Sequence, residues 1–353
     1  MLAPATHIIP LTVIQRRRLL PAEGRLQVRQ GQNVRATDVI ATASLKPKHV
    51  MLDIAAGLGV GRGEAKKFIE RYLEDEVAEG DVIAKKTGLM TRSVRAPVEG
   101  RLVLITDGFV MLEAKTPQFE LLAGIPGQVA ELIHNLGAVI ETSGALVQGM
   151  WGNGRVDFGL LNVLADGPDA VLTPDQIDVS LRGGVILSGH CSSPEALRNA
   201  ADQRLRGLVL GSLDAELSPL ARKMAFPILL TDGFGHLPMN ERAFKLLSTN
   251  NKRDIALNAE PLNRMTGSRP EILIPLPGGE RLDAPAPVGR LGAGVLVRIT
   301  RDPYRGRLAV VDALLPGRTT LQNGLRVSAA SVTIVGGETA QVPLANLEIL
   351  NQG

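Results

Sequence analysis

Between residues 184 and 247, short apolar runs alternate with amphipathic segments, and this alternation constrains the fold more than any other feature. The apolar runs and the segments of helical spacing that follow them are 184–188 and 193–205, 207–211 and 218–225, and 227–231 and 240–247. Ser193 can cap the first helix, with Pro194 at its first position. Strands that alternate with helices are typical of a parallel α/β sheet. The sequence therefore predicts a small α/β domain at 180–260.

Residues 1–165 show short apolar runs broken by Gly and Pro instead. Residues 34–41 read VRATDVIA, and residues 77–84 read VAEGDVIA. Each copy places a turn between two short strands, so the repetition predicts a compact β structure built from similar hairpins. Between the copies, residues 63–76 carry apolar side chains at helical spacing and predict a helix. The expected fold class is therefore mixed β and α/β, with a β-rich region at 1–165.

The second copy and the segment after it carry a family resemblance. Residues 80–84 (GDVIA) and 94–100 (VRAPVEG) resemble the biotinyl/lipoyl-like, or barrel-sandwich hybrid, family, which includes swinging-arm carrier domains and domains of membrane-fusion adaptors. Carrier domains present a modified lysine at the hairpin tip. The tip here, residues 87–92, has no lysine, and Lys85 and Lys86 lie too early. The resemblance implies barrel-sandwich-like modules without a biotin or lipoyl cofactor.

The C-terminal residues carry a second resemblance. A segment rich in Pro and Gly at 261–288 predicts a linker, and alternating strand patterns follow it at 289–353. Residues 297–299, 303–306, 308–311 and 342–348 are the matching ones. They resemble the KOW/SH3-like barrel of ribosomal proteins and NusG-type transcription elongation factors, although Ala309 stands where that family usually has glycine. Such barrels bind RNA, polymerase or ribosomal proteins in relatives, so the resemblance implies a docking module.

Four residues on the expected first loop of this barrel are candidates for partner binding. They are Arg301, Tyr304, Arg305 and Arg307. Guanidinium groups beside an aromatic ring could contact phosphates and stack on a base. A solvated loop without a binding role is the alternative, and the sequence leaves both open. The leading functional hypothesis is a non-enzymatic adaptor that docks on a protein or RNA partner through residues 289–353.

Two strand-to-helix loops, 188–193 and 231–236, support an alternative hypothesis. Their candidate residues are His190, Cys191, Asp232 and His236. Ligands of open α/β sheets bind at the carboxyl ends of the strands, so these side chains could converge there. An enzyme would use a histidine as acid or base, the thiol as nucleophile and the aspartate as orienting group. Short connections also need glycine for purely structural reasons, so small-ligand binding or hydrolase- or transferase-type catalysis stays an open alternative.

Two glycine-rich segments are weaker candidates. Residues 57–63 place a glycine at every second position, which could favour phosphate binding at a helix start, but the spacing fits neither the dinucleotide fingerprint nor a P-loop. Trp151 lies among Gly149, Gly152 and Gly154. This setting predicts a core or interface anchor, with ligand stacking as the alternative.

Composition limits the remaining possibilities. A single cysteine excludes an internal disulfide and cysteine-rich zinc or iron–sulfur sites, and His7, His49 and His134 are dispersed without metal-binding spacing, so no metal or cofactor is predicted. The net charge of +3 is small for a protein that coats nucleic acid. The chain has no apolar run of about eighteen residues, and Arg16–Arg18 follow the N-terminal apolar stretch instead of preceding it. A cytoplasmic location is expected, and the oligomeric state stays open.

Overall fold

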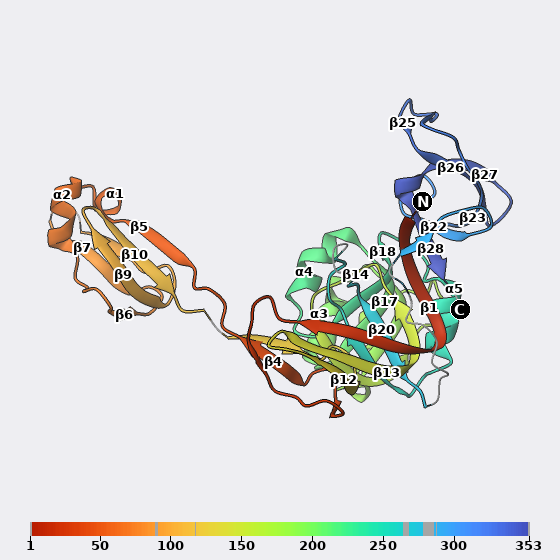
Figure 1. The fold of residues 1–353 in the computed structure, drawn as a ribbon, viewed down its shortest axis with the longest axis horizontal. Helices are drawn as coiled ribbons and strands as arrows, with labels where there is room; N and C mark the ends of the chain where they lie inside the picture. The colour runs from red at the N-terminus through yellow and green to blue at the C-terminus, as the bar shows by residue number, and fades with distance from the viewer. Residues whose placement is uncertain are drawn as a thin grey trace. The chain divides into compact units, whose positions relative to one another are not determined.

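The chain folds into two compact units, as the computed structural model shows (Figure 1). The structure describes residues 2–88, 91–116, 118–263, 268–277, 286 and 288–351. Most elements are strands arranged in mixed sheets, as the sequence predicted. Unit 1 comprises Met1–Leu19, Val28–Ile40 and Leu122–Gly353, and unit 2 comprises Leu20–Gln27 and Ala41–Leu121. The division therefore falls inside residues 1–165, because the chain leaves unit 1 after Ile40 and returns to it at Leu122.

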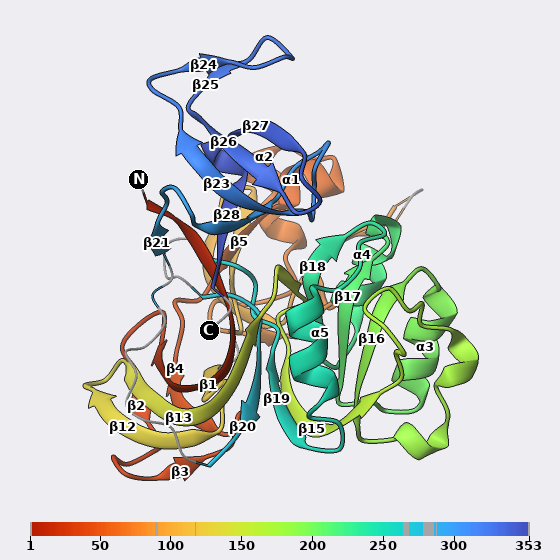
Figure 2. The same ribbon diagram turned by 90° about the vertical axis from the view of Figure 1, so that its right-hand side faces the viewer.

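The middle of unit 1 is a parallel sheet with helices packed on it (Figure 2). Its elements are β15 (Val156–Val163), β16 (Val185–Cys191), α3 (Pro194–Asp202), β17 (Gly207–Leu213), α4 (Ser218–Lys223), β18 (Ile228–Phe234) and α5 (Glu241–Ser248). Strands β15, β16, β17 and β18 pair with one another in parallel in that order. Ser193 caps α3 by accepting from the Ala196 amide, and Asn240 caps α5 in the same way. The strands and helices expected between residues 184 and 247 are therefore confirmed.

Strands β16, β17 and β18 are covered on both faces. Successive side chains of a strand point to opposite faces of a sheet. Ile186 and Leu208 accordingly pack with α3 and α4 in one core, whereas Val209 and Leu229 pack with α5 in another. Double burial explains why these strands read as unbroken apolar runs.

An antiparallel region continues this sheet within unit 1. Its strands are β1 (Leu2–Leu19), β3 (Asn33–Val34), β12 (Gly127–Ile133), β13 (Gly137–Gln148), β14 (Trp151–Gly152), β19 (Asp254–Asn258) and β20 (Glu271–Pro275). Strand β20 falls in the segment 261–288 that was expected to be a linker. Strands β13 and β19 pair with it on either side, and Ile272 and Ile274 pack into the same core as Val209 and Leu229. Residues 264–267, 278–285 and 287 of that segment lie outside the described ranges.

The strands after residue 288 surround a separate core. They are β21 (Val288–Arg290), β22 (Leu296–Ile299), β23 (Leu308–Leu314), β24 (Thr319–Thr320), β25 (Arg326–Val327), β26 (Ala329–Ile334), β27 (Thr339–Pro343) and β28 (Leu347–Asn351). Val297, Ala309 and Val332 are among the buried residues of this core. Strand β28 pairs with β22 and, in parallel, with β1. The two ends of the described chain therefore meet in one sheet.

Unit 2 has its own core, formed by residues such as Ile83, Leu102 and Leu112. The strands β5, β10, β9 and β6 form one sheet, β7 and β8 another, and β11, β4 and β2 a third. The elements are β2 (Arg25–Leu26), β4 (Val39–Ala43), β5 (His49–Asp53), α1 (Ile54–Leu58), α2 (Arg62–Ala65), β6 (Glu76–Val77), β7 (Val82–Lys86), β8 (Arg92–Arg95), β9 (Gly100–Thr106), β10 (Phe109–Ala114) and β11 (Phe119–Leu122). No helix in the described ranges is long and apolar enough to span a membrane.

The helix expected at 63–76 is wrong beyond its first turns. Helix α2 ends at Ala65, and a 3-10 turn covers Lys66–Phe68. Ile69 is then extended and forms a β-bridge with Ala84, and the next amide donates to the carbonyl of Ile83. The backbone beyond the turn is thus used for pairing with β7, which helical spacing alone does not reveal.

The repeated motif forms the same turn in both copies. The carboxylate of Asp38 accepts from the Arg35 amide at 2.8 Å, and that of Asp81 accepts from the Ala78 amide at 3.2 Å. Each copy is a strand, a turn and a strand, as predicted. The first copy belongs to unit 1 up to Ile40 and the second to unit 2. The repeat therefore marks a recurring turn and not one compact hairpin assembly.

Candidate functional site

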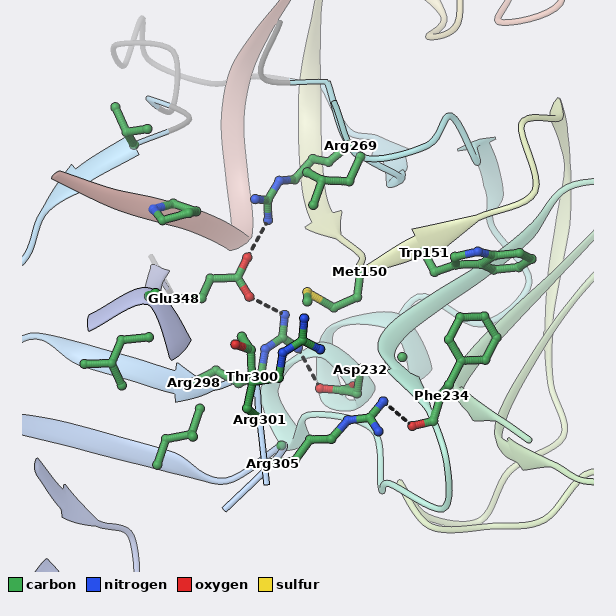
Figure 3. A pocket seen from close by; sticks show the side chains of 18 of the residues that line it. Met150, Trp151, Asp232, Phe234, Arg269, Arg298, Thr300, Arg301, Arg305 and Glu348 are labelled. Atoms are coloured by element: carbon green, nitrogen blue, oxygen red, sulfur yellow. Dashed lines mark hydrogen bonds and ion pairs between the residues drawn. The ribbon is translucent and has the colours of Figure 1, made fainter. Parts of the chain in front are cut away.

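A cavity of about 440 Å³ opens in unit 1 where β18 ends (Figure 3). Its walls come from β14, the end of β18, β22 with the loop 300–306, and β28. The carboxyl end of a parallel strand is where α/β proteins place their ligands. The volume lies within the range of small-molecule sites.

A buried ion-pair network forms the floor of this cavity. Arg298 donates to Asp232 Oδ1 at 2.8 Å and to Glu348 Oε2 at 3.0 Å. Arg269 donates to the other oxygen of Glu348 at 3.0 Å, and Thr6 hydrogen-bonds that same oxygen. Figure 3 shows Glu348 held between the two guanidinium groups. The network ties β1, β18, β22 and β28 together around the cavity.

The charges of this network are fixed by their mutual contacts. Burial alone would raise the pKa of Glu348, but Arg298, Arg269 and the hydrogen bond from Thr6 lower it below the ordinary value. Burial would likewise lower the pKa of Arg298, whereas Glu348 and Asp232 raise it. Both side chains are therefore charged at neutral pH. The Nε atom of Arg298 is buried and has no hydrogen-bond partner within the described ranges.

Two further arginines extend the positive side of the cavity. Arg305 donates to the carbonyl of Phe234 at 2.5 Å and keeps its other donors free of partners in the described chain. Arg301 is exposed, lines the cavity and makes no hydrogen bond or ion pair with the described residues. The lining thus carries four arginines and two carboxylates, and those carboxylates pair with Arg269 and Arg298.

The opposite wall is apolar. The rings of Trp151 and Phe234 pack edge to face, with centroids 5.3 Å apart. Met150 and Leu262 also line the cavity. Trp151 is held by pairing of β14 with β18 and stays partly exposed. The sequence predicted a core or interface anchor at Trp151, with ligand stacking as the alternative. Its position in the cavity wall makes contact with a ligand geometrically feasible.

His190 and His236 come together, as the loop positions suggested, but not with Asp232. Their ring centroids lie 4.4 Å apart. His190 Nδ1 contacts Ser212 Oγ at 2.9 Å, and its Nε2 lies 3.4 Å from Asp214 Oδ1. The contacts of Asp232 are instead with Arg298, the Thr231 hydroxyl and the Asn240 amide.

The hydrogen bonds around Ser212 fix the proton on His190. Ser212 Oγ lies 2.6 Å from the carbonyl oxygen of Leu237, which can only accept, so the hydroxyl donates there. His190 Nδ1 must then donate to Ser212 Oγ. This is the reverse of the arrangement in which a histidine withdraws a proton from a serine nucleophile. Burial lowers the pKa of His190, and His236 lowers it further.

Cys191 is the last residue of β16, and its side chain packs into the core beneath α3. Its side chain is fully buried, and its thiol contacts the carbonyl oxygen of Ser193 at 3.6 Å. Burial raises the pKa of the thiol to about 11. A nucleophilic cysteine needs an accessible thiolate, and this environment disfavours one.

The four candidates for partner binding are mostly engaged inside the chain. Tyr304 packs against the core of the C-terminal strands, and a hydrogen bond with Glu338 raises the pKa of its phenol. Arg307 pairs with the same Glu338 at 2.9 Å. Arg305 holds the Phe234 carbonyl, so Arg301 is the member of this set that reaches the cavity without an internal partner.

The cavity residues that the sequence did not single out as candidates are Arg298, Glu348 and Arg269. Arg298 lies between Val297 and Ile299, and Glu348 lies between Leu347 and Ile349. A charged residue inside a fully buried strand needs a partner of opposite charge. That rule could have flagged both positions, although not which residues pair.

The described part of the chain has no cluster of three or more His, Cys, Asp or Glu side chains that could hold a metal ion. In comparisons with known proteins, no family model matches the chain, and no curated protein is significantly similar to it in sequence. The geometry of the site is therefore the basis for assigning a function.

Proposed function

We propose that this chain is a binding protein that holds a small organic molecule in the cavity at the end of β18. The observation that carries the proposal is a cavity of about 440 Å³ with an aromatic wall and a fixed ionic floor. Sites of this kind combine apolar walls with a few oriented polar groups. A change in the shape of the cavity that separated these ion pairs would leave buried charges unpaired, which is costly. The network therefore also holds the shape of the cavity.

Binding is favoured over catalysis by the environment of the reactive groups. Within the described ranges, the cavity lining does not include His190, Cys191 or His236. Its two carboxylates, Asp232 and Glu348, are held by guanidinium groups and are poor bases for that reason. An enzyme at the loops 188–193 and 231–236 stays the alternative, and turnover of a bound compound would support it.

The test uses a variant that fills the mouth of the cavity. Ala345 is exposed and lines the cavity, so Ala345→Phe should exclude a ligand without disturbing the core. Ala313→Phe, at an exposed position on β23 outside the lining, is the matched control. Small molecules released by denaturing the purified full-length proteins would be compared by mass spectrometry. A compound retained by the wild type and the control but lost from Ala345→Phe is expected; equal retention by all three would refute the proposal.

We also propose a second role, in which residues 289–353 are a KOW/SH3-like docking barrel and unit 2 is a biotinyl/lipoyl-like module. The antiparallel series β22, β23, β26 and β27, with β28 returning to β22, supports the barrel. The hairpin of β24 and β25 extends from these strands (Figure 2) and exposes Leu325 and Arg326. An exposed apolar side chain beside a cation suits a protein partner.

Deleting residues 289–353 would not test docking cleanly, because it removes Glu348 and the strand that pairs with β1. The doubly substituted Leu325→Asp/Arg326→Gln chain would serve instead, with Val335→Asp as a control at another exposed apolar position. A protein captured from native lysate by the wild type and the control, but not by the double variant, is expected. Capture that nuclease abolishes would indicate RNA, and identical capture by all three would refute docking through the hairpin.

A further inference from the structure

We infer that the ligand of the cavity is an organic anion, a carboxylate or phosphate ester, whose charged group binds Arg301 and Arg305 and whose flat apolar part lies against Trp151 and Phe234. The inference rests on the proposed binding function and names its ligand class. The class of ligand follows from how the charges around the cavity are paired.

The carboxylates of the cavity lining are already paired with arginines. Asp232 and Glu348 are both held by Arg298, and Glu348 is held by Arg269 as well. No carboxylate in the described lining is therefore free to receive a cation. The positive charges of Arg301 and Arg305 have no carboxylate partner in the described chain. The cavity thus has a surplus of positive charge that an anion would neutralise.

The surplus positive charge is carried by guanidinium groups. A guanidinium presents several N–H groups in a plane and binds carboxylate or phosphate oxygens through two of them at once. Arg305 is already oriented by its bond to the Phe234 carbonyl, which reduces the entropy lost on binding. Arg301 has no partner among the described residues, so its guanidinium can rotate onto the same anion.

The wall opposite the arginines is aromatic. Figure 3 shows the guanidinium groups of Arg298, Arg301 and Arg305 on one side of the cavity and the rings of Trp151 and Phe234 on the other. An inorganic anion would leave this aromatic surface in water. A ligand with both an anionic end and a flat body uses both sides, and ring contacts add to the affinity.

The experiment measures binding of a matched probe series to the full-length protein. The probes are benzoate, phenyl phosphate, the neutral benzamide and the cationic benzylammonium ion, with acetate and inorganic phosphate as anions without a ring. Trp151 is the single tryptophan of the chain, so its fluorescence reports on this cavity. Benzoate or phenyl phosphate is expected to bind at least about tenfold more tightly than the other probes, and more weakly as salt is added. The stronger of the two identifies the anion.

Substitution of the unpartnered arginine provides the second readout. Arg301→Gln should weaken the preferred aromatic anion about three- to tenfold, as loss of a charge-assisted contact does, and should leave benzamide unchanged. Arg318→Gln, at an exposed arginine outside the lining, should change neither. Because Arg301 has no partner in the described chain, a folding defect is not expected.

The outcomes separate this inference from the function on which it rests. Benzylammonium or benzamide binding as tightly as benzoate and phenyl phosphate would overturn the anion class, as would an unchanged affinity in Arg301→Gln. Binding by no probe, while a co-purified compound is still lost from Ala345→Phe, would overturn the inference and leave the binding function in place. If no probe binds and no compound co-purifies, both the anion class and the binding function are overturned.

Discussion

Arg298 has nearly all of its side chain buried between two carboxylates, so its contribution to stability should be large. Arg298→Met leaves the charge of Asp232 unpaired in the interior. It also removes one of the two guanidinium groups that pair with Glu348. Removing one partner of a buried ion pair costs about 3–5 kcal/mol. Arg307, whose pair with Glu338 is exposed, provides the control, since exposed pairs contribute about 0–1 kcal/mol. Urea unfolding would measure the free energy of unfolding of both variants. Equal small losses for Arg298→Met and Arg307→Met would contradict the large contribution expected of Arg298.

Glu348 should make the protein sensitive to acid. Its pKa is lower in the folded chain than the ordinary value of 4.5, so the folded state favours the carboxylate. The stabilisation is complete above pH 4.5 and is lost as the pH falls through the folded-state pKa. Urea unfolding between pH 6 and pH 3 would measure the loss. Glu348→Gln should be less stable at pH 6 but lose less between pH 4.5 and pH 3; a parallel decline would contradict the prediction.

Cys191 should be inert in the folded protein. With the pKa raised to about 11 by burial, only a very small fraction of the thiol is ionised at pH 8, and the side chain is inaccessible. Alkylation by iodoacetamide at pH 8 should be negligible in the native state and complete in guanidinium chloride. Rapid stoichiometric labelling of the native protein would revive the nucleophile hypothesis.

At the scale of elements, the cap of α3 can be tested directly. Ser193 accepts from the Ala196 amide, so Ser193→Ala should cost about 1 kcal/mol of stability. Ser192 is the neighbouring exposed serine, and Ser192→Ala should have little effect. Chemical denaturation of the two variants would compare them. Equal losses would mean that the cap contributes nothing specific.

The elements that the sequence predicted best have local signals. Helices α3 and α5 follow capping residues and have helical spacing, and their flanking strands are uniformly apolar. The helix expected at 63–76 failed because a distant strand, β7, pairs with its backbone at Ile69. Strand β20 was missed because prolines surround it, while its burial depends on β13 and β19, which flank it in space.

The candidate site was predictable only in part for a related reason. The sequence placed Asp232 at the carboxyl end of a parallel strand, and it lies near the end of β18 in the lining of the cavity. Its partner was not predicted, because Asp232 and Arg298 are 66 positions apart. No local pattern encodes such a pair. The contacts of Tyr304 and Arg307 with Glu338 have no local signal either. Because of these contacts, both side chains interact within the chain.

At the scale of the molecule, the two units should unfold separately. Each has its own buried core, with Leu112 fully buried in unit 2 and Leu229 in unit 1. Leu→Ala substitutions at such sites cost about 2–5 kcal/mol. Calorimetry should resolve two unfolding transitions. Leu112→Ala should lower the transition temperature of unit 2, and Leu229→Ala should lower that of unit 1. A single transition lowered equally by both variants would show that the units unfold together.

The pairing of β1 with β28 also has a consequence for the order of events during synthesis. Thr6 and Glu348 are separated by 342 positions. At a translation rate of about 5–20 residues per second, residues 5–7 of β1 wait roughly 20 to 70 seconds for β28 to be made, whereas the rest of β1 can pair with β13 much earlier. Residues 41–121 are contiguous and can fold soon after they leave the ribosome. The nascent chain therefore carries a finished unit 2 while the start of β1 still lacks its parallel partner strand, a period in which a chaperone would be most useful.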